Sequence, residues 1–135
     1  MSAQGLAIKA VYNILKNTSA VTDIATGGIY SGQIRQANIP PLILITEEGL
    51  RPQDTKSDAA GTGATTNIHI LTVSLYAKDQ QTLENLAIQV DAALNHYSGT
   101  ANSVVVDDIR ITDTNGDFIQ DIYYKNMDLE VWTKQ

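Results

Sequence analysis

Residues 80–97 read QQTLENLAIQVDAALNHY, and their apolar positions repeat at the spacing of an amphipathic helix. These positions are Leu83, Leu86, Ala87, Val90, Ala93, Leu94 and Tyr97. Asp79 precedes the run as a candidate N-cap, and Gly99 follows it as a candidate C-cap region. The pattern predicts a helix from about Gln80 to Tyr97, and this helix organises the fold because two strand-like stretches lie on each side of it.

The two stretches before the helix differ in pattern. Residues 41–45 are continuously apolar, which predicts a strand buried on both faces. Residues 68–77 predict a second strand whose apolar residues share one face from position 71 onward, whereas Ile68 and Ile70 belong to the opposite phase. The start of this strand is therefore either buried on both sides or interrupted by a bulge.

The last third of the chain predicts a hairpin. Two strand-like segments, Val104–Thr114 and Asp117–Thr133, are separated by Asn115-Gly116, the pair favoured in a type I′ turn. Apolar residues in the second segment change from even to odd positions, which predicts a bulge near Lys125-Asn126.

A first helix from about Ala3 to Asn17 precedes all the strands. The resulting order predicts an α+β fold: a mostly antiparallel four-stranded sheet, arranged β-β-α-β-β after the N-terminal helix, with two helices packed on one face. We expect one domain over residues 1–135, with a long polar arm over about residues 48–66 between the first two strands.

The arm is unusual for a small domain. Leu50 is the only large aliphatic residue in residues 47–67. Most connections in compact domains have about 4–6 residues, and structureless loops beyond about 12–15 are usually functional or disordered. The length of the arm therefore calls for a function.

Composition excludes several classes of protein. Nine Lys plus Arg residues against fifteen Asp plus Glu give a net charge of -6, the wrong sign for tight binding of nucleic acid. The chain has no cysteine, so disulfides and thiol chemistry are excluded. Neither a cleavable signal nor a membrane-spanning run is present in the sequence, so we expect no membrane partner.

Candidate chemical motifs fail on spacing. Asp113–Asp117 superficially resembles a calcium loop but lacks the required Gly and Glu positions, and Gly61–Gly63 lacks the ending of a phosphate loop. His69 and His96 have no triad or zinc spacing around them. Glu47-Glu48 is better explained as a solvated pair, because adjacent strand residues point to opposite faces. The sequence thus predicts no catalytic, cofactor-binding or metal-binding residue.

Several short segments together resemble one family. They are Gly27-Gly28-Ile29-Tyr30, Ile39-Pro40-Pro41-Leu42-Ile43, Val73-Ser-Leu-Tyr76-Ala-Lys-Asp79, the long helix and the Asp-containing hairpin. In order and spacing they resemble the tail completion or tail terminator proteins of long-tailed phages, over nearly the whole chain. Pro41 departs from the pattern, since many relatives place an aromatic residue there.

The resemblance implies a structural virion protein rather than an enzyme. It implies a homo-oligomeric ring, typically of six copies, that terminates the tail tube and joins it to the head or neck, with a channel through which DNA passes without specific binding. The implied partners are further copies of the chain, the tail tube protein and a head-tail connector. No cofactor is implied, and assembly would occur in the host cytoplasm before the protein becomes part of the virion.

Two alternatives to the tail terminator stay open at this point. The chain fits a neck or head-tail connector subunit that docks on the portal side. A small ligand-binding domain or enzyme, using Glu47 and Glu48 with the arm as a lid, is the weaker alternative because site signals are absent.

Residue type selects the expected contact points. Within the arm we expect Leu50, Arg51, Pro52 and Lys56 to contact other subunits. Elsewhere we expect Tyr30, Arg35 and Trp132 to anchor ring interfaces, because Tyr, Trp and Arg are enriched where binding energy concentrates.

Overall fold

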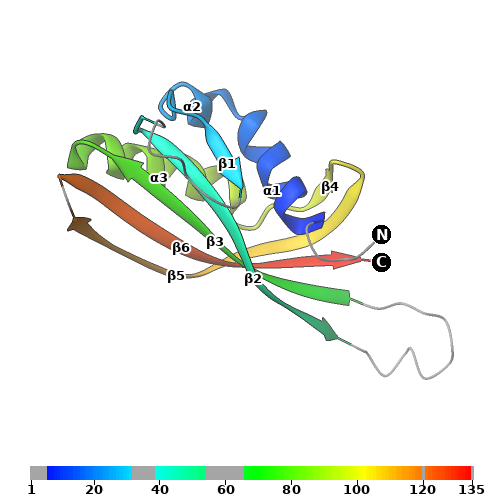
Figure 1. The fold of residues 1–135 in the computed structure, drawn as a ribbon. Coiled ribbons are helices and arrows are strands. Elements are labelled where there is room, and N and C mark those ends of the chain that lie inside the picture. The colour runs from blue at the N-terminus through cyan, green and yellow to red at the C-terminus, as the bar shows by residue number, and fades with distance from the viewer. Residues whose placement is uncertain (1–5, 32–38, 54–65, 120, 135) are drawn as a thin grey trace, which may run out of the picture.

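The computed structural model describes residues 6–31, 39–53, 66–119 and 121–134. Its elements are α1 (Leu6–Lys16), α2 (Ser19–Thr22), β1 (Ile29–Ser31), β2 (Leu42–Gln53), β3 (Thr66–Ala77), α3 (Gln80–Leu94), β4 (Gly99–Ala101), β5 (Val104–Ile119) and β6 (Ile122–Lys134). A curled six-stranded sheet has the order β1-β2-β3-β6-β5-β4, and the helices cover one of its faces (Figure 1). The α+β class is therefore confirmed.

The predicted sheet of four strands is too small. The four long strands β2, β3, β6 and β5 are adjacent and antiparallel, as expected. The predicted sheet leaves out two three-residue strands: β1 pairs with β2 in parallel, and β4 pairs with β5. Segments this short contain too few residues to show an alternating pattern, so only their neighbours in the fold define them.

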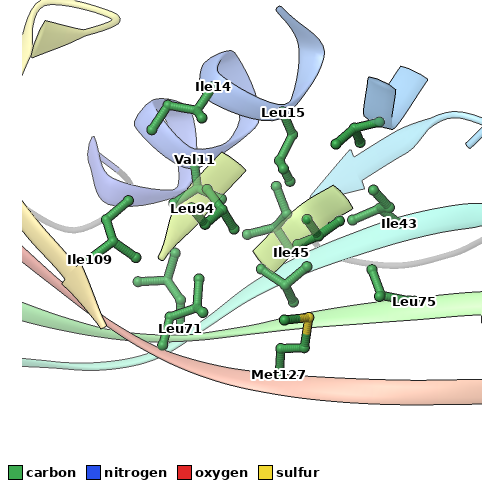
Figure 2. Close-up of a cluster of buried hydrophobic side chains, with 14 of the residues drawn as sticks. Val11, Ile14, Leu15, Ile43, Ile45, Leu71, Leu75, Leu94, Ile109 and Met127 are labelled. Carbon is green, nitrogen blue, oxygen red and sulfur yellow. The ribbon is translucent and has the colours of Figure 1, made fainter. Parts of the chain in front are cut away.

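The core lies between the helices and the covered face of the sheet. Figure 2 shows Val11 and Leu15 of α1, Leu94 of α3 and Leu71 of β3 converging there, and all four side chains are fully buried. Burial of such side chains contributes about 1.5–3 kcal/mol each relative to exposure. The helices are thus held on the sheet mainly by apolar contact.

The start of the central helix is as predicted, and its end is not. Asp79 caps α3, since its carboxylate accepts a hydrogen bond of 2.8 Å from the backbone N–H of Thr82. The Thr82 hydroxyl donates a second hydrogen bond to the same carboxylate. The backbone bond, followed by this side-chain bond, holds the pKa of Asp79 below its ordinary value. The helix ends at Leu94 with Asn95 as C-cap, and Gly99 instead begins β4. The C-cap prediction at Gly99 is therefore wrong.

The predicted hairpin turn at Asn115-Gly116 is also wrong. Asn115 and Gly116 lie inside β5, paired with Asn126 and Lys125, and the strands connect between Ile119 and Ile122. Apolar pairs on the covered face, such as Ile109 with Val131, hold this register because slipping it would expose them. Tertiary burial here outweighs the local turn preference.

The bulge predicted near Lys125-Asn126 does not occur. β6 pairs with β3 without interruption from Lys134 to Tyr123. The odd positions of β6 face the helices throughout, and the register shifts lie instead in β5 and between Glu47 and Gly49 of β2. In β3 the start is buried on both sides, since Ile68 is only 3% exposed.

The arm is partly strand. β2 continues to Gln53 and β3 begins at Thr66, so the predicted arm of residues 48–66 includes a paired base. Gln53 and Thr66 are direct register partners. Residues 54–65 lie outside the described part of the chain.

Gly116 permits a close approach of β5 to β6. A β-carbon at this position would lie 2.5 Å from the backbone oxygen of Tyr124 and 3.3 Å from Cα of Lys125. We therefore expect Gly116→Ala to lower the free energy of unfolding by about 1–3 kcal/mol, as overpacking does. Denaturant titration measures this loss.

Gly49→Ala is the matched control, because a β-carbon there would meet no atom within 4 Å. It should be neutral, or stabilise by about 0.4–1 kcal/mol through the unfolded chain. Equal stability of the two variants would contradict the proposed close approach.

Candidate assembly surface

The face of the sheet away from the helices, here called the open face, carries a row of polar side chains across three strands. Thr72 Oγ1 of β3 lies 2.9 Å from a carboxylate oxygen of Glu48 on β2 and 3.2 Å from one of Asp128 on β6. Two residues further along β3, Ser74 donates a hydrogen bond of 2.8 Å to the side-chain oxygen of Asn126 on β6. The row is ordered by its own hydrogen bonds and leaves acidic oxygens at the surface.

The two ends of the open face carry aromatic residues. At one end Tyr76 and Tyr124 pair across β3 and β6, with ring centroids 6.3 Å apart. At the other end the guanidinium of Arg110 lies 4.7 Å from the centre of the Trp132 ring and 2.9 Å from the carboxylate of Asp108. Stacking on Trp132 and pairing with Asp108 hold the Arg110 side chain flat against the sheet.

Trp132 has one unusual atom. Its ring Nε1 is buried and has no hydrogen-bond acceptor among the described residues. Buried indole N–H groups usually find a partner. The ring therefore contributes apolar and cation–π contact rather than a satisfied hydrogen bond.

A buried polar cluster lies at the base of the arm, on the covered face. His69 is 1% exposed, with Nδ1 3.4 Å from a carboxylate oxygen of Glu47 and Nε2 3.1 Å from the hydroxyl of Thr133. Burial lowers the pKa of His69 from its ordinary value, and the attraction of the Glu47 carboxylate opposes this shift without overcoming it. The neutral ring then donates from one nitrogen and accepts at the other.

The expected arm contacts lie partly within the described structure. The backbones of Leu50, Arg51 and Pro52 pair with His69, Ile68 and Asn67 respectively. Lys56 lies outside the described residues. Their role as contact points stays a prediction, and the structure adds that the first three belong to a strand.

The three expected anchors are not brought together. Tyr30 lies on the edge strand β1, half-buried, and its hydroxyl donates to the backbone oxygen of Gly27. Trp132 lies on β6, with two strands between it and β1. Arg35 lies outside the described residues. Their role in ring interfaces also stays a prediction.

The carboxylates of Glu47 and Glu48 lie on opposite faces of the sheet, because Glu47 approaches His69 and Glu48 approaches Thr72. They do not form an acid/base pair. In the described ranges no group of three His, Asp or Glu side chains is placed to hold a metal ion, and no described helix has the length and apolarity needed to span a membrane.

Reasoning from sequence missed the residues that build the open face: Thr72, Ser74, Arg110, Asn126 and Asp128. Alternation in β3, β5 and β6 places them opposite the core, but which of them meet depends on the register between strands. The turn predicted at Asn115-Gly116 implies a different register between β5 and β6. The sequence therefore did not predict the contact between Arg110 and Trp132.

Comparison with known proteins gives a family and a fold. The family model of tail completion protein gp17 matches residues 9–134. A chain in the solved virion of a native gene transfer agent (GTA) particle shares the fold with a TM-score of 0.69 and 12% sequence identity, and the match covers 98% of this chain and 100% of that one. No curated protein sequence matches this chain.

Proposed function

Because this chain belongs to the tail completion protein gp17 family, we propose that it forms a ring that closes the end of a phage tail tube and joins the tube to the head. Family membership makes it a structural protein of the bacteriophage virion, located in the tail. Beyond family membership, the proposal states that six copies of the chain form the ring and that the ring encloses a channel for DNA. The family match over residues 9–134 is the observation that carries it.

A ring of identical subunits needs two different surfaces on each subunit, which meet in a heterologous contact that closes. The helices occupy one face of the sheet and leave the other face uncovered by them (Figure 1). One subunit can therefore contact its neighbours through its ends and present the open face to a third component. The tail tube protein and a head-tail connector are the proposed partners above and below the ring.

The open face suits the wall of a DNA channel. It carries the carboxylates of Glu48, Asp108, Asp128 and Glu130, together with the paired Arg110. Carboxylates repel phosphates within about 8–10 Å at physiological salt. A wall of this kind lets DNA pass without holding it.

Charge reversal on the open face tests the channel. We expect the double variant Glu48→Lys with Glu130→Lys to form tails joined to heads while DNA release slows, because lysines would bind the passing phosphates. Phage titre should fall by at least about tenfold. Asp91→Lys, at an exposed position of α3 on the opposite side of the sheet, is the matched control. Wild-type infectivity of the double variant would refute the channel wall.

Knockout of the gene separates terminator from connector. Loss of a terminator should leave tails of abnormal length, seen by electron microscopy, because nothing stops addition of tube subunits. Loss of a connector should leave tails of normal length beside unjoined heads. Light scattering of the purified protein tests the ring itself, with a mass of six subunits expected.

A further inference from the structure

A cleft with aromatic walls lies between the start of α3 and the end of the β5–β6 hairpin. Leu83, Phe118 and Tyr123 form its apolar lining, and Glu84 and Asp117 stand at its rim. Phe118 is 47% exposed, although its ring lies 4.4 Å from that of Tyr123. An exposed aromatic pair beside carboxylates is suited to contact an apolar side chain with a positive charge next to it.

The surroundings of this cleft are acidic. The segments that border it, residues 78–84 and 113–125, contain five carboxylates and two lysines. The carboxylates are Asp79, Glu84, Asp113, Asp117 and Asp121. Lys125 is already paired, since its ammonium lies 2.8 Å from Glu84. The cleft therefore presents net negative charge to an approaching molecule.

The outer surface of α1 has the opposite character. Ile8, Lys9, Tyr12 and Lys16 line a cleft to which Ser31 and Asn102 also contribute. The ammonium of Lys16 lies 5.5 Å from the centre of the Tyr12 ring. The sequence of α1, LAIKAVYNILK, contains no acidic residue. This surface combines an aromatic ring with uncompensated positive charge on its own helix.

The two surfaces lie well apart in the molecule (Figure 1). The β5–β6 turn and the first residues of α3 are at one end, whereas α1 and β4 lie toward the other (Figure 1). One chain cannot bring them together, but two copies arranged head to tail can. Such a contact joins different surfaces, as a closed ring requires.

We propose that the basic face of α1 in one subunit docks into the acidic cleft at the hairpin end of the next subunit. This inference rests on the proposed ring and names the contact that builds it. Tyr12 and Phe118 supply apolar area, and Lys9 and Lys16 meet Glu84 and Asp117. Complementary charge selects the partner surface and the register, while the aromatic residues supply most of the affinity.

Charge reversal on each surface tests the docking. The double variants Lys9→Glu with Lys16→Glu, and Glu84→Lys with Asp117→Lys, should each raise the protein concentration needed for ring formation by at least about tenfold. Sedimentation velocity measures this concentration, and circular dichroism confirms that each variant is folded. Asp91→Lys, at an exposed position of α3 outside both surfaces, is the control and should form rings as the wild type does.

An equal mixture of the two double variants gives the sharper result. Each subunit then finds complementary charge only on the other kind, so rings with alternating subunits should reappear, and an even copy number allows them to close. A mixture that stays monomeric contradicts the direct pairing. If both double variants form rings at the same concentration as the wild type, this interface is wrong but the ring stands. If the wild-type protein itself never oligomerises, the ring is wrong as well.

Discussion

Leu71→Ala should lower the free energy of unfolding by about 2–5 kcal/mol, the range for removing a large aliphatic side chain from a packed core. Leu71 is fully buried, and in Figure 2 it lies under Val11, Leu94 and Ile109. It is therefore near the point where both long helices meet the sheet. For a chain of this size the melting temperature should fall by roughly 10 °C, which calorimetry or thermal circular dichroism measures.

Ile88→Ala is the control for this substitution. Ile88 lies on α3 and is 60% exposed. Alanine is also a better helix former than isoleucine, so the change in stability should stay within about 0.5 kcal/mol. A loss of less than about 1 kcal/mol for Leu71→Ala would contradict the arrangement of the core.

Elements with a strong local signal were predictable. The central helix combines a long apolar repeat with a capping aspartate, and both are properties of neighbouring residues. Its start at Gln80 agrees with the prediction, and its end at Leu94 differs because Asn95 turns the chain toward β4. Local information therefore identifies the helix and its first residue more reliably than its last.

The β5–β6 hairpin shows why register was not predictable. Asn115-Gly116 is a strong turn signal, yet Gly116 serves a different purpose, the close approach of two strands. The connection instead passes Asp121, which adopts a positive φ of 65° that aspartate tolerates better than most residues. Both signals are present in the sequence, and burial of the covered face decides between them.

The open face depends on this same register. Residue type alone singled out Trp132 as an expected anchor, but only the observed pairing of β5 with β6 brings Arg110 into contact with its ring. The acidic row formed by Glu48 and Asp128 likewise needs three strands in their correct order. Charge composition indicated an acidic protein, and the fold determines where that acidity lies.

Removal of residues 54–65 should separate folding from assembly. Gln53 and Thr66 are direct register partners, so an Asn-Gly turn can join them as a two-residue hairpin. We expect the shortened protein to fold with unchanged stability or a gain of about 1 kcal/mol, because its loop is shorter. Denaturant titration of the purified variant measures this.

Infectious particles should nevertheless decrease by at least about 100-fold, as for loss of roughly 3 kcal/mol of binding free energy. We expect this because, apart from Leu50, the sequence of the arm has no large aliphatic residue with which to form a core of its own, and we propose that it contacts a neighbouring subunit or the tube. A Gly/Ser replacement of equal length is the control that separates arm length from arm sequence. If both variants give wild-type titre, residues 54–65 have no part in assembly, and the paired base at Leu50 and Arg51 becomes the segment to test.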